Sequence, residues 1–181
     1  MPYIVLDLEA TCWREQRPNQ HNEIIEIGAV RLDDQGQVVS EFAQFVKPLK
    51  HPLLSDFCTE LTSITQAQVE AAPYFSDVLP EFFAWAGIGT ERYLLCSWGF
   101  YDRKQLAQDC ALHGLDAAWT QPHISLKHQY AQIRRLKRPI GMARALAMEG
   151  LHLDGTHHRG IDDARNITKI FQRYLEEWQE A

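Results

Sequence analysis

The pattern of apolar and polar residues predicts β-strands in the first quarter of the chain. Residues 3–9 contain the apolar run Ile4-Val5-Leu6, which is too short for a helix and typical of a buried strand. Residues 23–32 (EIIEIGAVRL) and 38–46 are rich in β-branched and apolar side chains, and the turn-forming sequence Asp33-Asp34-Gln35-Gly36 separates them. We therefore expect three antiparallel strands in a meander.

The pattern changes to helical spacing after residue 48. Ser55 and Thr65 stand where helix N-caps are expected, and Gln68 follows Thr65 at the position that completes a capping box. Residues 75–85 have apolar side chains at helical intervals, although Pro80 predicts a kink or a different boundary. One more strand is expected at 93–98, and further helices at about 102–113, 126–136, 142–148 and 162–177. This order predicts a single α/β domain over residues 1–181, with a mixed sheet and helices on its faces.

Composition and charge narrow the possible functions. The chain has 181 residues, of which 45% are hydrophobic and 23% charged, as is usual for a globular protein. The sequence has no membrane-length apolar run and no basic flank before its first strand, so we expect neither membrane association nor a signal peptide. The four cysteines lack disulfide-framework or zinc spacing, which favours core thiols and a cytoplasmic location. The net charge of −6 disfavours binding of nucleic acid by basic residues alone, but carboxylates that hold divalent cations would remove this objection.

Asp7 and Glu9 are the first candidates for such carboxylates. Because they are two residues apart on a predicted strand, their side chains project from the same face. Burial of two like charges is costly unless a cation neutralises them, and a hard divalent metal does this with carboxylate ligands. The alternative is an exposed edge strand, which is the commoner explanation of an isolated Asp-x-Glu. The apolar residues before Asp7 make the two explanations about equal.

The last predicted helix adds a third acid, Asp163. It lies on the apolar stripe of that helix, which consists of Ile167, Ile170, Tyr174 and Trp178. Its neighbour Asp162 falls instead on the polar face, with Asn166, Lys169 and Arg173. We therefore expect Asp163 to face the sheet, although capping of the helix by this residue explains its position equally well.

A histidine and a fourth acid complete the set of candidates. His158 lies five residues before Asp163, and an imidazole there can act as a general base. His157 is an equal competitor on the local sequence, and an isolated loop histidine is more often solvated. Asp102 follows the strand predicted at 93–98, where an N-cap is the commoner explanation.

Together these segments resemble a known family. DLEATC at 7–12, Asp102 after SWGFY, and HRGIDD at 158–163 are similar to the motifs of the DnaQ-like DEDDh 3′-5′ exonucleases. The resemblance is strongest to the Eri-type branch, which includes histone-mRNA and small-interfering-RNA exonucleases and the bacterial relatives among which we place this chain. It extends nearly end to end through EIIEIGAV, FVKP, LSDFC, LTSITQAQV and DDARNITKI. It implies a ribonuclease-H-like mixed five-stranded sheet flanked by helices.

The resemblance also implies a site and a reaction. The four metal-site acids would be Asp7, Glu9, Asp102 and Asp163. His158 would be the base, because the tyrosine class of the superfamily has Tyr where this chain has Arg159. Two Mg²⁺ ions are expected, with Mn²⁺ able to substitute. The reaction would release nucleoside 5′-monophosphates from single-stranded 3′ ends, with RNA favoured over DNA.

Contacts to the substrate are less strongly defined by the sequence. The resemblance implies that the segment 61–65 walls the terminal nucleotide, with Ile64 or Leu61 against the base, and Trp98 could stack on a base. All three side chains are equally plausible as core residues. The basic run Arg134-Arg135-Lys137-Arg138 is either a solvated face or a track for the strand behind the 3′ end.

Two other functions fit the same fold. One is an RNA-binding protein that does not cleave, and the complete set of acids disfavours it. The other is an enzyme that cuts internally, which the His158–Asp163 pairing disfavours. The sequence does not define an oligomeric state.

Overall fold

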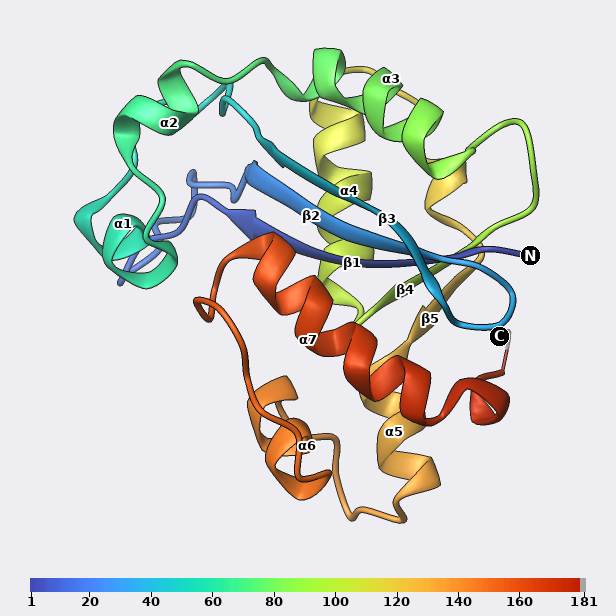
Figure 1. Cartoon of the computed structure of the whole chain (residues 1–181). Coiled ribbons are helices and arrows are strands. Elements are labelled where there is room, and N and C mark those ends of the chain that lie inside the picture. The colour runs from blue at the N-terminus through green and yellow to red at the C-terminus, as the bar shows by residue number, and fades with distance from the viewer. Residues whose placement is uncertain (180–181) are drawn as a thin grey trace.

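The computed structural model describes residues 1–179, and a five-stranded mixed sheet forms its centre (Figure 1). Strands β1 (Tyr3–Ala10), β2 (Ile24–Leu32) and β3 (Val38–Phe45) form the predicted antiparallel meander. Strands β4 (Leu94–Ser97) and β5 (His123–Ser125) continue the sheet in parallel on the other side of β1, in the order β3-β2-β1-β4-β5. The sequence pattern missed β5, a strand of only three residues, two of them polar.

Seven α-helices follow or alternate with these strands in the described part of the chain. They are α1 (Asp56–Thr62), α2 (Gln66–Glu70), α3 (Phe75–Ala86), α4 (Tyr101–Leu112), α5 (Leu126–Ile133), α6 (Met142–Met148) and α7 (Gly160–Arg173). Two short 3₁₀ segments lie at Ala118–Thr120 and Leu175–Glu177. Ser55 and Thr65 cap α1 and α2 as predicted, and Thr65 forms a capping box with Gln68. Helix α3 continues across Pro80 to Ala86, so of the two alternatives a different boundary is wrong.

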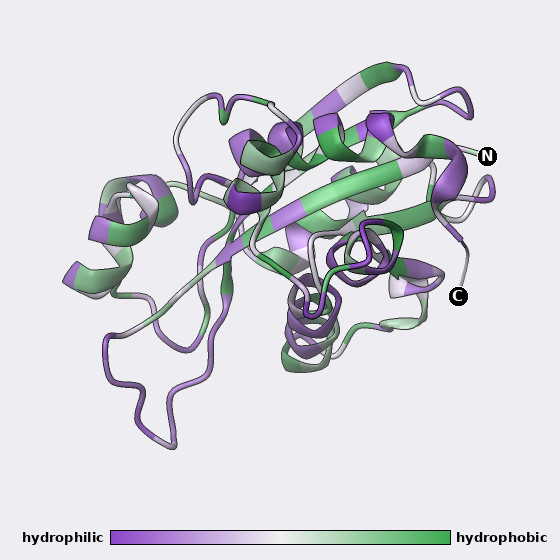
Figure 2. Ribbon diagram, turned by 90° about the horizontal axis from the view of Figure 1, so that it is seen from below, coloured by the Kyte–Doolittle hydropathy of each residue, from purple (hydrophilic) through white to green (hydrophobic). Residues whose placement is uncertain are grey.

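The helices cover the two faces of the sheet in separate layers. Helices α5, α6 and α7 pack on the face that includes Val5 of β1, whereas α3 and α4 pack on the face of Ile4, Leu6 and Leu8. The strands are accordingly drawn largely in the hydrophobic colour, while the loops around them are mostly hydrophilic (Figure 2). Among residues 1–179, no helix is long and apolar enough to cross a membrane. Because successive side chains on a strand alternate, Asp7 lies on the same face as Val5, towards α7.

Helix α7 begins directly against the sheet. A Cβ on Gly28 of β2 would lie 2.0 Å from the carbonyl carbon of Gly160, and one on Gly160 would lie 3.0 Å from the carbonyl oxygen of Asp7. Gly28 is also the cross-strand partner of Asp7. Two glycines therefore allow the first turn of α7 to approach the backbone of β1 and β2, at the level of Asp7.

One side of α7 differs from the prediction. Asn166, which we expected on the polar face, is fully buried. Its amide donates to the carbonyl of Asp154 at 2.8 Å and accepts from the Asp154 N–H at 3.0 Å. The segment before the helix therefore folds back over this side and uses Asn166 to satisfy its backbone. Helix α7 also begins two residues earlier than predicted, and it ends at Arg173.

Candidate active site

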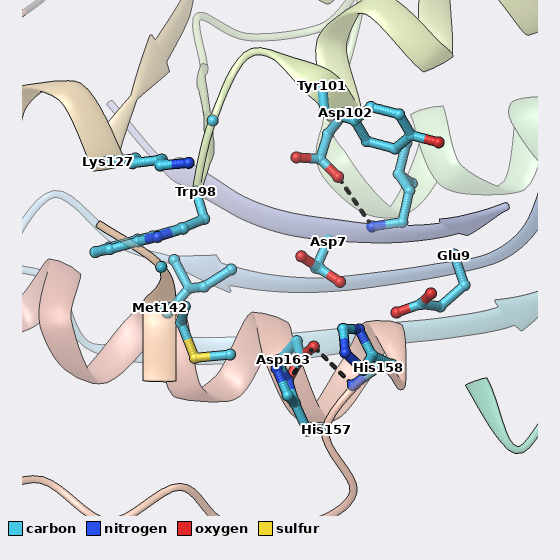
Figure 3. Close-up of a pocket in the computed structure, with 14 residues that line it drawn as sticks. Asp7, Glu9, Trp98, Tyr101, Asp102, Lys127, Met142, His157, His158 and Asp163 are labelled. Atoms are coloured by element: carbon cyan, nitrogen blue, oxygen red, sulfur yellow. Dashed lines mark hydrogen bonds and ion pairs between the residues drawn. The ribbon is translucent and has the colours of Figure 1, made fainter. Parts of the chain in front are cut away.

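The four predicted acids line one cavity of about 410 Å³ (Figure 3). Carboxylate oxygens of Asp7, Glu9 and Asp163 lie within 4.8 Å of one another. Asp102 lines the same cavity without belonging to that close set. The structure thus brings together residues from β1, α4 and α7, and the exposed-edge explanation of Asp7 and Glu9 is wrong.

Asp102 is held by the first strand. It is buried in the first turn of α4, and its carboxylate accepts a hydrogen bond of 3.2 Å from the Leu8 N–H. The pairing of β1 with β4 ends at Val5 and Cys96, so the Leu8 N–H lies beyond it and donates to Asp102. Asp102 does not cap its own helix, because the N-cap is Phe100 and no side chain caps there. Its carboxylate instead links α4 to the strand that carries Asp7.

Asp163 faces the cavity, as its position on the apolar stripe predicted. Its side chain is buried, and it accepts a hydrogen bond of 2.9 Å from the backbone N–H of His158. The N-cap of α7 is Arg159, without a side-chain cap, so Asp163 is not the helix cap. The carboxylate therefore fixes the histidine loop while presenting its oxygens to Asp7 and Glu9.

A buried glutamate on β2 anchors the start of α7. Glu26 is 2% exposed and accepts hydrogen bonds from the Gly160 N–H at 3.0 Å and from the Arg159 guanidinium at 3.1 Å. Arg159 is the position that the tyrosine class would use for catalysis. Here its side chain pairs with Glu26, and Arg159 does not line the cavity. This arrangement leaves the two histidines as the candidate bases.

Burial and mutual repulsion make the acids hard to ionise without a cation. Burial is the largest cause that raises the pKa of Asp7 well above its usual value, and Asp102, Glu9 and Asp163 add to it. Burial, followed by Asp163, raises the pKa of Glu9 to about 8. Burial also raises the pKa of Asp102 to about 6, against the hydrogen bond from Leu8. These shifts are expected of carboxylates gathered to hold metal ions.

The donor set fits divalent metal ions. Among residues 1–179, no hydrogen bond or ion pair to a side chain neutralises the carboxylate of Asp7 or Glu9. The atoms of Asp7, Glu9 and Asp163 that could bind a metal are all carboxylate oxygens, which are the ligands that Mg²⁺ and Mn²⁺ prefer. The residues present therefore match the cofactor expected from the sequence.

Both histidines lie at the cavity, so the structure does not reduce the two candidates to one by position alone. His157 places its Nδ1 atom 3.0 Å from both carboxylate oxygens of Asp163. His158 stacks on His157 at 4.0 Å between ring centroids and lines the same cavity as Glu9. Burial, followed by the neighbouring His157, lowers the pKa of His158. His158 also has a left-handed backbone, with φ of 65°, which non-glycine residues adopt rarely and often at functional sites.

The predicted substrate contacts divide into three outcomes. Ile64 is fully buried with Ile25, Cys58 and Val69, which fits its alternative as a core residue, and its contact with a nucleotide stays a prediction. Leu61 is 38% exposed at the end of α1 but does not line the cavity, and its role stays a prediction. Trp98 does line the cavity, while its indole N–H donates to the Ile140 carbonyl at 3.0 Å.

Tyr101, Lys127 and Met142 also line the cavity, and the sequence did not predict them there. Tyr101 precedes Asp102 and is 53% exposed, which makes it a better stacking surface than Trp98, at 8% exposed. Lys127 and Met142 lie at the starts of α5 and α6. The position of Tyr101 next to Asp102 was the one sequence signal that could have indicated a cavity residue. Lys127 and Met142 are far from the other site residues in the sequence, and only the fold brings them to the cavity.

The comparisons with known proteins agree with this geometry. Residues 4–171 match the family model described as Exonuclease. ERI1 exoribonuclease 2 of Xenopus laevis is 32% identical over 95% of this chain, which spans only 28% of that protein's length. The solved nuclease domain of 3′hExo is described as a DEDDh family member bound to rAMP, and it superposes on this chain with a TM-score of 0.93 at 32% identity. The match covers 99% of this chain and 96% of the solved chain.

A second solved structure concerns 3′-end-specific recognition of a histone mRNA stem-loop by a 3′-exonuclease. It has a TM-score of 0.89 at 31% identity, and the match covers 99% of this chain and 83% of the solved chain. Both likenesses extend over 99% of this chain, and they support the ribonuclease-H-like fold expected from the sequence. The chain belongs to the DEDDh family of 3′-5′ exonucleases, and its relatives within that family are of the Eri type.

Proposed function

We propose that this chain is a metal-dependent 3′-5′ exonuclease that releases nucleoside 5′-monophosphates from single-stranded 3′ ends. The observation that carries the proposal is the group of Asp7, Glu9 and Asp163, whose carboxylate oxygens lie within 4.8 Å of one another in a cavity that Asp102 also lines. Family membership supports the activity, and the relatives named exoribonucleases support RNA over DNA as the substrate.

In this proposal, Asp7, Glu9 and Asp163 would hold one Mg²⁺ ion, and Asp7, with Asp102 acting through water, would hold a second; Mn²⁺ would substitute for either. Bound in this way, the ions supply a nucleophile at neutral pH and stabilise negative charge on the phosphate and the leaving 3′-oxygen. The chain's own part is to fix the carboxylates through the Leu8 N–H and the packing of α7 on the sheet. His158 accepts the proton of the attacking water, and its lowered pKa keeps the imidazole neutral for this role.

The two histidines then have different tasks. His157 is hydrogen-bonded to both oxygens of Asp163, so its imidazole orients that acid. His158 contacts Asp163 through its backbone N–H, which leaves its ring available for a proton. Tyr101, exposed at the cavity, stacks on a base of the substrate.

Three further statements remain parts of the proposal. Residues 1–181 act as one exonuclease domain, the protein is cytoplasmic, and it comes from the bacterial side of the Eri branch. The activity itself is tested by incubating a 5′-labelled single-stranded RNA with Mg²⁺ and the wild-type or Asp7→Asn protein. We expect cleavage by the wild type alone. Binding of the RNA by the wild type without any cleavage would instead support the RNA-binding alternative.

A further inference from the structure

The positive charge of this acidic chain is concentrated in one stretch. Residues 117–148 contain no Asp or Glu but six basic residues, which are Lys127, Arg134, Arg135, Lys137, Arg138 and Arg144. The rest of the chain then has 12 basic and 24 acidic residues. Such segregation in a protein of net charge −6 is unusual for a purely solvated face, where charges of both signs normally mix.

This stretch reaches the active-site cavity at two places, the starts of α5 and α6. Lys127, in the first turn of α5, lines the cavity, and so do Gly141 and Met142, where α6 begins. Figure 3 shows Lys127, Trp98 and Met142 on the side of Asp7 away from Glu9. The Trp98 indole also donates to the Ile140 carbonyl at 3.0 Å, which ties the end of the loop to the cavity wall.

The loop between α5 and α6 is anchored at its other end as well. Arg134 makes an ion pair of 3.5 Å with Glu149, which is itself buried, and a hydrogen bond of 3.3 Å to the Tyr174 hydroxyl. Leu136 packs against the core. One cation of the stretch is thus used to hold the loop in place, and the others project from a fixed backbone.

None of the other five cations of the stretch forms an ion pair within residues 1–179; Arg144 lies on α6, and Lys127 is half-buried at the cavity. Arg135, Lys137 and Arg138 are exposed. Together, Lys127, Arg135, Lys137 and Arg138, which we call the α5 basic surface, offer four free positive charges that lead away from the cavity.

We propose that the α5 basic surface binds the phosphates of the nucleic-acid strand upstream of its 3′ end. This inference rests on the proposed function and extends the same site outward. Helix α5 has eight residues and is about 12 Å long. Stacked nucleotides of one strand advance roughly 3.4 Å each, so about four nucleotides separate the phosphate at Lys127 from that at Arg135. A dinucleotide is too short to reach the loop.

The test compares a strand that reaches the loop with one that does not. The variant is Arg135→Gln/Lys137→Gln/Arg138→Gln, and the matched control is Arg17→Gln/Lys50→Gln/Lys104→Gln, which removes three exposed charges elsewhere. On a 12-nucleotide single strand we expect the variant to raise KM tenfold or more, with kcat/KM on a dinucleotide unchanged. Each lost phosphate contact should also reduce the slope of log Kd against log salt concentration by about 0.7. The loss of three contacts in the variant should therefore reduce this slope by about 2.

Binding of the fluorescent 12-nucleotide strand in EDTA, measured by anisotropy, separates this inference from the proposed activity. Weaker binding by the variant than by the control supports the surface even if the wild type cleaves nothing, in which case only the proposed function fails. Equal binding by variant and control, or an equal loss of activity on the 12-nucleotide strand and the dinucleotide, overturns the proposal.

Discussion

The contact between β2 and α7 gives a sharp test of how the site is assembled. A Cβ at residue 28 would lie 2.0 Å from the backbone of both Gly160 and Ile161, whereas ordinary contact begins at 3.4 Å. Gly28→Ala must therefore push the start of α7 away by about 1.4 Å, because the opposing atoms are backbone and cannot rotate aside. Overpacking of this kind costs about 1–3 kcal/mol of folding free energy. Asp163 would move with the helix, and misplacement by about 1 Å can cost on the order of 10²-fold in rate.

The assay has two measurements, the midpoint of urea unfolding and kcat/KM on a labelled RNA strand. We expect Gly28→Ala to lose both stability and about 10²-fold in kcat/KM under conditions where it remains folded. Gly141→Ala is the stability control, because a Cβ there meets no atom within 4 Å and the backbone φ of −67° suits alanine. If Gly28→Ala keeps wild-type stability and activity, the close approach of α7 does not position Asp163 as argued.

Three further predictions concern the cavity itself. His158→Ala should reduce kcat by the factor of about 10²–10⁴ typical of a general base, and His157→Ala should reduce it by less. Single-turnover kinetics of the two variants measure this difference, and a larger loss in His157→Ala would assign the role of base to His157. Because the folded-state pKa of Glu9 is raised to about 8 from 4.5, the metal-free fold binds more protons than the unfolded chain between these values. Its Tm should therefore be highest near pH 4.5 and fall as pH rises to 8, and Mg²⁺ should restore it most at high pH; a Tm that rises over this range in EDTA contradicts the shift. Tyr101→Ala should raise KM for single-stranded RNA by the equivalent of about 1–3 kcal/mol with little change in stability, as steady-state kinetics and thermal melting can show.

The sequence predicted the parts of the site that follow from periodicity. The two-residue spacing of Asp7 and Glu9 determines a shared face once the segment is a strand, and the stripe that includes Ile167 and Ile170 places Asp163 inward. The same reasoning failed for Asn166, because the helical pattern cannot show that residues 152–156 fold back over the helix. Local periodicity gives orientation relative to the element, whereas tertiary contacts decide what covers it.

Other features were inaccessible for a different reason. Strand β5 has only three residues and is specified by pairing with β4. Ile64 packs into a small core with Cys58, and the resemblance of its segment to a substrate wall could not show this burial. Lys127 enters the cavity only because α5 begins at the carboxyl end of the sheet beside Trp98.

The most direct test of the central claim is the pattern of products from a 5′-labelled single-stranded RNA, compared with a DNA of the same sequence. With Mg²⁺, the wild type should shorten the labelled strand one nucleotide at a time from its 3′ end and release nucleoside 5′-monophosphates. The ladder should be absent in EDTA and with Asp7→Ala, whose circular dichroism should match that of the wild type. Labelled fragments from internal cuts at the outset, or equal degradation by Asp7→Ala, would contradict the assignment of a carboxylate-held, metal-dependent exonuclease site.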